Sequence, residues 1–162
     1  RRAIRAGGEV ERTSDVSRFL DLYRPVALAR GVEYPAEIIR RLAADGCCDC
    51  YDVLLEGRAV SSLLVLRGPQ HWRYWAAAQD DRGRKIEAGY LALATMLEDA
   101  FKASAGFVNL GASRSGGQDL DGVDRIKRRL GSHEEPIVEI RSGLVDPRVL
   151  RAPARIAQRL RR

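Results

Sequence analysis

A lysine within a predicted helix is the residue whose setting most suggests chemistry. Between residues 123 and 130, at about 100° per residue, Val123, Ile126 and Leu130 form one apolar stripe. Lys127 falls at the edge of that stripe, whereas the neighbouring arginines point the other way, toward water. An ammonium group beside a buried face must either reach back to solvent or meet an anion. Lys127 is therefore either a snorkelling side chain or a site lysine that binds a phosphate or an acyl oxyanion.

A second basic cluster precedes the strongest helix signal in the chain. The turn Arg82-Gly83-Arg84-Lys85 comes just before a run of residues, from about Gly89 to Lys102, in which apolar side chains repeat with helical spacing. The first turn of a helix has free N–H groups and a partial positive charge. We therefore predict that Arg82, Arg84 and Lys85 surround a phosphate-binding pocket at the start of a helix that begins near Ala88–Gly89. The alternative is a basic loop on a basic protein.

Other polar and aromatic residues give weaker signals. Glu87 and Asp52 are candidate general bases, and nothing in the sequence selects between them. Ser113 lies in a Gly/Ser-rich loop without a nearby Asp/His pair, so no hydrolase triad is predicted. Three aromatic residues either line an acceptor groove or belong to the core: Tyr74, Trp75 and Tyr90.

The cysteines do not predict a metal site. Cys47, Cys48 and Cys50 form the whole cysteine complement, and the two histidines stand at no familiar ligand spacing from them. An odd number of clustered thiols also argues against a disulfide framework and for a reducing compartment. We expect buried thiols at a strand edge and no metal.

Length and charge restrict the possible classes of protein. A chain of 162 residues fits one domain. No apolar run is long enough to span a bilayer and no signal peptide is present, which predicts a cytoplasmic protein or one peripheral to a membrane. The chain lacks an initiator Met, so we expect a piece of a longer protein. The net charge of +6 favours anionic partners. The positive charge also raises a nucleic-acid-binding module as an alternative function, but the chain has no recognised motif of that kind and no interleaved aromatic residues.

The periodicity of apolar residues predicts the order of elements. Expected strands cover residues 4–12, 51–55, 59–66, 72–78, 107–110 and 136–141, and the three in the middle should form an antiparallel meander. Expected helices cover 16–29, with a kink or break at Pro25, then 35–46, 89–102, 123–130 and 147–162. Ile38 in the helix over 35–46 and Phe101 in the helix over 89–102 should point inward. We predict one domain over residues 1–145 and a basic C-terminal helix over 146–162. That helix should be dispensable for the core.

Two short motifs resemble the FemAB-like branch of the GNAT N-acyltransferase superfamily. That branch has a strand ending in Asp-Phe-Gly, a small polar loop, and then Phe-Lys-x-x-Phe-Gly. The chain has Asn109-Leu110-Gly111-Ala112-Ser113 and later Ile126-Lys127-Arg128-Arg129-Leu130-Gly131. The resemblance implies an α/β (α+β) fold with a mixed, mostly antiparallel sheet flanked by helices. It also implies an active-site role for Lys127, whose ammonium we expect in a cleft near Gly111 and Ser113.

The same resemblance implies an activity and its substrates. GNAT enzymes hold the pyrophosphate of acyl-CoA at the helix after the meander, with the signature Gln/Arg-x-x-Gly-x-Gly/Ala; Gly83 and Gly89 do not reproduce its spacing. The resemblance predicts an acyl-CoA (acetyl-CoA) or aminoacyl-tRNA donor, bound by Arg82, Arg84, Lys85, Gly89, Gly111 and Ser113. The acceptor would be an amine-bearing small molecule or a cell-envelope precursor. A partner GNAT-like module upstream is also implied, and the alternative is a non-catalytic module of such a tandem protein.

Overall fold

The computed structural model describes residues 1–32, 34–111, 127–129 and 131–132. Residues 1–132 belong to one compact unit. Several predicted features lie outside the described residues: Ser113, the strand over 136–141, the C-terminal helix over 147–162, the boundary after residue 145, and most of the helix over 123–130.

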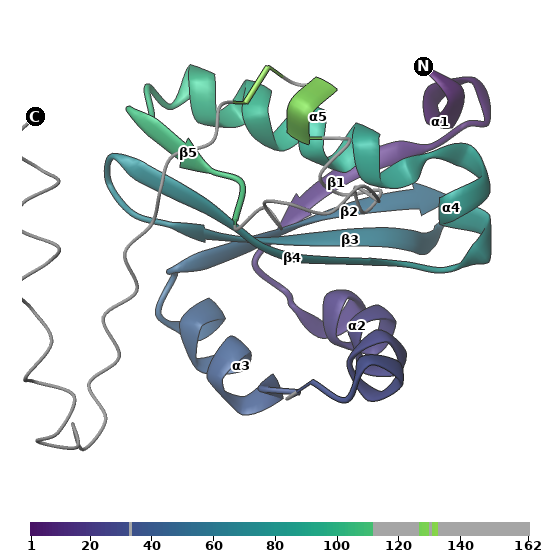
Figure 1. The fold of residues 1–162 in the computed structure, drawn as a ribbon, viewed down its shortest axis with the longest axis horizontal. Coiled ribbons are helices and arrows are strands. Elements are labelled where there is room, and N and C mark those ends of the chain that lie inside the picture. The colour runs from purple at the N-terminus through teal and green to yellow at the C-terminus, as the bar shows by residue number, and fades with distance from the viewer. Residues whose placement is uncertain (33, 112–126, 130, 133–162) are drawn as a thin grey trace, which may run out of the picture. The chain divides into compact units, whose positions relative to one another are not determined.

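One five-stranded sheet organises the unit (Figure 1). Its strands are β1 (Glu9–Thr13), β2 (Cys48–Leu55), β3 (Arg58–Arg67), β4 (His71–Gln79) and β5 (Phe107–Asn109), and they lie side by side in chain order. The first four pair antiparallel, and β5 pairs parallel to β4. The turn between β2 and β3 has positive φ at both Glu56 and Gly57, as a tight hairpin requires. The predicted meander and the mixed, mostly antiparallel sheet are confirmed.

Helices cover both faces of the sheet. The helices α2 (Ser17–Arg30) and α3 (Ala36–Ala44) lie on one face, and α5 (Ala88–Lys102) lies on the other (Figure 1). Two shorter helices are α1 (Arg2–Arg5) and α4 (Asp81–Ile86). Beneath α5, the core includes Tyr51, Leu63 and Met96, whereas Phe19 and Ile39 pack under α2 and α3 with inward-facing β2 and β3 side chains. The start of α5 at Ala88 is as predicted.

Four details of the sequence interpretation are wrong. Residues 2–5 form helix α1 rather than the start of a strand, and Pro25 does not break α2, because burial of Phe19 and Ala27 on either side of it holds the helix together. Ile38 of α3 is 58% exposed and Phe101 of α5 is 86% exposed, although both were expected to point inward. Phe101 lies about 140° around the helix from the buried Met96, which takes it beyond the buried stripe.

The thiols are partly as predicted. Cys48 and Cys50 are buried, but β2 is an interior strand between β1 and β3, so they do not lie at a sheet edge; Cys47 is exposed. Among the described residues there is no cluster of three or more His, Cys, Asp or Glu side chains that could hold a metal ion. No helix among them is long and apolar enough to span a membrane.

Asp52 is a fully buried carboxylate beneath α2. It accepts a hydrogen bond of 2.5 Å from the Ser62 hydroxyl, and Arg18 Nη1 lies 3.6 Å from its other oxygen. Burial raises the pKa of the Asp52 carboxyl above its ordinary value, and the hydrogen bond from Ser62 and the charge of Arg18 offset this only in part. The protonated form is therefore favoured by folding.

We expect Asp52 to make stability fall as pH rises. A carboxyl whose folded pKa is raised binds its proton more tightly in the native state, so stability is greatest below the ordinary pKa and declines as pH rises through the folded value. The free energy of unfolding of the wild type should fall relative to that of Asp52→Asn across this window. Urea unfolding at a series of pH values measures the difference, with Asp21→Asn on the exposed side of α2 as the control. A wild-type free energy of unfolding that rises with pH relative to that of Asp52→Asn would contradict the expectation.

Candidate functional site

The pairing of β4 with β5 covers only part of β4. It joins His71, Trp72 and Arg73 to the three residues of β5. Just beyond, the register of β4 against β3 shifts so that Trp75 is an extra residue, which makes a bulge. A bulge bends its strand and increases its twist. From Tyr74 to Gln79, β4 therefore has an edge without a strand partner in the described part of the chain.

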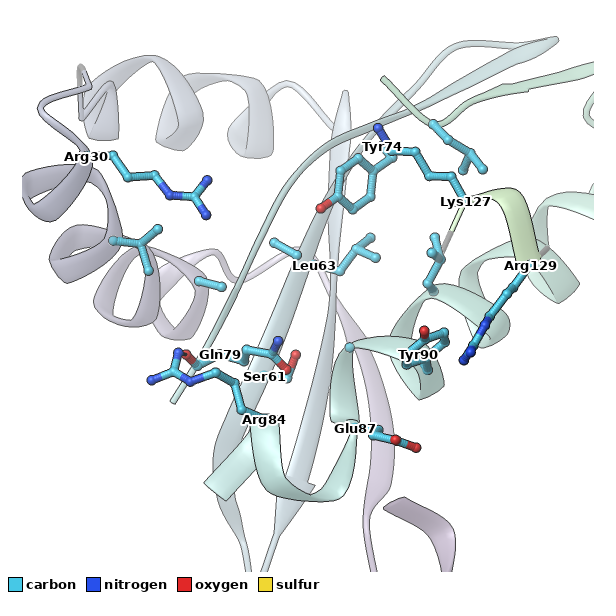
Figure 2. A pocket seen from close by; sticks show the side chains of 16 residues that line it. Arg30, Ser61, Leu63, Tyr74, Gln79, Arg84, Glu87, Tyr90, Lys127 and Arg129 are labelled. Atoms are coloured by element: carbon cyan, nitrogen blue, oxygen red, sulfur yellow. Dashed lines mark hydrogen bonds between the residues drawn. The ribbon is translucent and has the colours of Figure 1, made fainter. Parts of the chain in front are cut away.

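A cavity of about 480 Å³ lies along this open edge of β4. Its walls come from elements that cover opposite faces of the sheet: Val26 and Arg30 belong to α2, whereas Gly89 and Tyr90 belong to α5. Figure 2 shows the labelled side chains around it, with Arg30 on the α2 side and Tyr90 on the α5 side. The cavity thus has walls on both sides of the sheet, at the point where β4 separates from β5.

Lys127 is buried at one end of this cavity. Only 9% of the residue is exposed, and its Nζ donates to the carbonyl oxygen of Gly111 at 3.5 Å. Its side chain runs toward Tyr74 (Figure 2). The expected position of the ammonium beside Gly111 is confirmed, and the snorkelling alternative does not fit a buried residue. The functional role of Lys127 remains a prediction.

The turn after β5 fits closely around this lysine. Gly111 has φ +81°, a backbone conformation that favours glycine, and a Cβ added there would lie 3.8 Å from both Lys127 Nζ and the Tyr74 carbonyl oxygen. The Asn109 side-chain oxygen accepts the Gly111 N–H at 2.7 Å. An aspartate carboxylate could accept the same bond, so Asn109 and the acid of the Asp-Phe-Gly motif can both support such a turn.

The predicted basic cluster does not converge. Arg82, Arg84 and Lys85 lie in α4, where successive side chains fan out by about 100°. Arg84 lines the cavity and donates to the Gln79 carbonyl oxygen. Arg82 instead forms a salt bridge of 2.8 Å with Glu56, and the exposed Lys85 does not line the cavity. Only Arg84 and Gly89 of the predicted phosphate-binding residues near α5 therefore lie at the cavity.

The weaker candidates are also separated by the structure. Tyr74 and Tyr90 line the cavity, whereas Trp75 packs against Phe19 on the α2 side. Glu87 lines the cavity in a left-handed conformation with φ +60°, directly before α5, and forms an exposed salt bridge with Arg2. Asp52 does not line it. Glu87 is thus the one of the two candidate bases that the structure places at the cavity.

Sequence reasoning missed a polar pair on the cavity wall. Ser61 of β3 and Gln79 of β4 lie directly opposite each other and both line the cavity. The Ser61 hydroxyl and the Gln79 Oε1 atom are buried and have no hydrogen-bond partner within the described residues. Buried polar atoms without partners are rare and cost free energy. The polar Ser61-Ser62 pair inside the apolar run of residues 59–66 was the available signal.

Positive charge predominates on the cavity wall. Among the described residues that line it, four are cationic and one is a carboxylate; the cationic ones are Arg30, Arg84, Lys127 and Arg129, and the carboxylate is Glu87. Arg30 and Arg129 were not predicted as site residues, because their positions depend on the packing of α2 and of residues 127–129 against the sheet. This excess of positive charge on the cavity wall favours an anionic ligand.

The sequence matches one protein-family model. That model is described as an acetyltransferase (GNAT) domain and matches residues 1–120 of the 162. No curated protein matches the sequence significantly.

Solved structures with the same fold include several acetyltransferases. A ribosomal-protein-alanine N-acetyltransferase from Brucella melitensis biovar Abortus 2308 has a TM-score of 0.65 and 13% identity, covering 84% of this chain and 99% of that one. An aminoglycoside acetyltransferase from an uncultured soil metagenomic sample, in complex with sisomicin, has a TM-score of 0.62 and 16% identity, with 88% and 99% covered. A predicted acetyltransferase from Clostridium acetobutylicum, with acetyl-CoA, has a TM-score of 0.60 and 11% identity, with 83% and 96% covered. At these identities the likeness establishes the fold.

Proposed function

The chain belongs to the GNAT acetyltransferase domain family, and from that premise we propose that it is an N-acyltransferase that moves an acetyl group from acetyl-CoA to an amine. The observation that carries the proposal is the cavity along the open edge of β4. One end has the buried ammonium of Lys127, and the other has the N-terminus of α5 with Arg84 beside it. A donor with an acyl group at one end and phosphates at the other matches this distribution of charge.

The phosphate end has the requirements of an anion site. The first N–H groups of a helix lack partners within it and carry partial positive charge. Gly89, in the first turn of α5, leaves space beside Gln79, since a Cβ there would lie 3.5 Å from Gln79 Oε1. Arg84 and Gly89 also occupy the first and last positions of the Gln/Arg-x-x-Gly-x-Gly/Ala signature, and the positive φ of Glu87 stands where the first glycine would be. These features support donor phosphates at this end.

The acyl end offers stabilisation of negative charge. When the amine attacks the thioester carbonyl, the C–N bond forms, the carbonyl oxygen becomes an oxyanion, and the C–S bond then breaks to release the CoA thiol. A buried ammonium aimed at that oxygen stabilises the transition state more than the ground state. Lys127 would act in this way, and solvent would take the amine proton, because Glu87 lies at the opposite, phosphate end of the cavity. Membership of the FemAB-like branch is part of the proposal and rests on Gly111, Lys127 and Gly131.

Glu87 favours a second donor for the same reaction. Its carboxylate stands at the helix N-terminus where the pyrophosphate of acyl-CoA would approach, and like charges repel. An aminoacyl-tRNA brings its ester to the acyl end without a pyrophosphate at that position. Measuring how much acetyl-CoA and aminoacyl-tRNA each raise the melting temperature distinguishes the two donors.

Ligand-dependent unfolding tests the proposal. A ligand that binds only the native state raises the free energy of unfolding, by about 2.7 kcal/mol at 100 times its Kd. We expect acetyl-CoA to raise the melting temperature more than an equal concentration of adenosine diphosphate, and mass spectrometry should then detect N-acetylated product with a suitable amine. Longer acyl-CoAs and aminoacyl-tRNA are run in parallel. Stabilisation by none of these donors would contradict the proposed function.

Ser61→Ala should leave stability unchanged or raise it, while weakening donor binding. The Ser61 hydroxyl has no hydrogen-bond partner within the described residues, so its removal breaks no hydrogen bond there. Removing an unpaired buried polar group is neutral or favourable for stability. If the donor satisfies that hydroxyl, its Kd should rise about 5- to 10-fold. Calorimetric titration with acetyl-CoA and thermal unfolding measure the two effects.

The adjacent serine is the matched control. Ser62 faces the other side of the sheet, where it donates to Asp52, so Ser62→Ala should lower stability and leave the donor Kd unchanged. Equal Kd values for wild type and Ser61→Ala would show that this hydroxyl does not contact the donor.

A further inference from the structure

Within the described residues, one cationic side chain, that of Arg30, lines the α2 side of the cavity. Val26 and Arg30 are four residues apart on α2 and therefore share a face, and both line the cavity. Arg30 also follows the buried residues Phe19 and Ala27 along the inward side of the helix. The inward side of α2 thus ends in an arginine, and Gly31 terminates the helix in a left-handed conformation directly after it.

Arg30 has no acidic partner in the described part of the chain. Other arginines discussed above do: Arg2 meets Glu87, Arg82 meets Glu56 and Arg84 meets Asp81. Among the described residues, no salt bridge or hydrogen bond involves the Arg30 side chain, which is exposed and extends from α2 toward Tyr74 across the cavity (Figure 2). A cation in the last turn of a helix interacts favourably with the helix dipole. That interaction alone does not explain why Arg30 lines the cavity.

A two-substrate reaction needs room for the acceptor as well as the donor. The proposed donor occupies the side with α4 and α5, so the wall formed by α2 is left for the acceptor. On the path from that wall to Lys127, the described side chains of the cavity include no carboxylate; Glu87, which is paired with Arg2, precedes α5. An acceptor with several positive charges would be repelled by Arg30 and Lys127.

From these observations we infer that the acceptor is an amine that also carries an anionic group, a carboxylate or a phosphate, and that Arg30 binds this group. The guanidinium donates two parallel hydrogen bonds to either anion, which fixes the orientation of the acceptor as well as its position. The amine end is then directed toward the acyl group beside Lys127. This inference rests on the proposed function and adds the chemical class of the acceptor.

Matched pairs of acceptors test the inference. One pair is β-alanine and β-alaninamide, and the other is O-phosphoethanolamine and ethanolamine, so that each pair differs in the anion. Initial rates of N-acetylation are measured by mass spectrometry with acetyl-CoA at saturation. We expect kcat/KM to be about 10- to 100-fold higher for the anionic member of at least one pair, the range expected of hydrogen bonds to a charged group. The pair with the larger ratio identifies the anion.

Two variants of α2 test whether Arg30 causes the preference for the anionic acceptor. Arg30→Gln should raise the KM of the anionic acceptor until the pair no longer differs, with the KM of acetyl-CoA unchanged. Arg24→Gln removes the same charge from an exposed position of α2 outside the cavity and should preserve the preference. Equal loss in both variants would overturn the inference, because general charge rather than a placed arginine would explain it.

The remaining outcomes separate the inference from the proposed function. Wild-type protein that acetylates the neutral member equally well, or binds acetyl-CoA but acetylates no anionic amine in the panel, overturns the inference and leaves the donor assignment intact. If no donor binds, the proposed function fails, and an NMR titration decides the inference separately. O-phosphoethanolamine or β-alanine should then shift the Arg30 Nε–H signal, assigned by its loss in Arg30→Gln. No shift with either compound overturns the inference.

Discussion

Replacing Lys127 with alanine should lower kcat by about 100- to 1,000-fold, the effect of removing one donor from an oxyanion site. The ammonium is buried at the end of the cavity where we propose that the acyl group binds, and weak screening there makes its field strong. Its hydrogen bond to the Gly111 carbonyl fixes its position before the substrate arrives. Steady-state acetyl transfer at saturating acetyl-CoA measures kcat, and the Kd of acetyl-CoA should change far less than kcat.

Two further substitutions separate catalysis from folding. Lys127→Met keeps most of the volume of the side chain and removes the charge, so it should lose the same activity with little change in melting temperature. Lys127→Arg is not a suitable control, since the guanidinium is larger and planar. Arg128→Ala changes an exposed neighbour outside the cavity and should keep nearly full activity. Equal losses at positions 127 and 128 would mean that general positive charge explains the activity.

Gly83→Ala should be the most destabilising glycine-to-alanine change among the glycines that the structure describes. A Cβ at Gly83 would lie 2.1 Å from the Val60 carbonyl oxygen and 3.2 Å from Gln79 Cβ. The first of these is a backbone atom of an interior strand, which cannot move without disturbing β3. We expect a loss of about 3 kcal/mol or more in the free energy of unfolding, the upper range for overpacking. Urea unfolding measures it.

Gly46→Ala is the matched control for Gly83→Ala. Gly46 has φ +68° and nothing within 4 Å of an added Cβ, so only the backbone conformation opposes alanine there, at about 1 kcal/mol. Similar losses at both glycines would show that β3 and α4 can separate easily, contrary to the packing described. A shift of α4 in Gly83→Ala should also displace Arg84 and weaken acetyl-CoA binding.

The sheet and its helices were predictable because local patterns dominate them. Alternation in β2, the apolar run of β3, the Glu56-Gly57 turn and the apolar stripe of α5 each predict their element without reference to the rest of the chain. Where burial depends on a neighbouring element, prediction failed. Phe101 and Ile38 are apolar residues on faces that no described element covers, and only the three-dimensional arrangement reveals this.

The site was predictable only at its sequence motifs. Gly111 and Lys127 were identified from a short pattern, and the structure brings them together across 16 positions of the chain. Arg30 carries no local signal, since an arginine in a last helical turn is an ordinary residue. For Ser61 the sequence offered only the polar Ser61-Ser62 pair within an apolar run. Arg82 and Lys85 were wrongly placed at the pocket because charge in sequence does not specify direction on a helix.

The cavity draws its walls from residues that are far apart in the sequence, from Val26 to Arg129, so we expect it to be completed late in folding. No single hairpin or helix pair contains it, and its ends meet only after contacts separated by a hundred positions have formed. A chain emerging from the ribosome would have most of its sheet before residue 129 is available to complete the wall. Intermediates with a native-like sheet would consequently have no substrate-binding activity, and the appearance of that activity would mark the end of assembly rather than its progress.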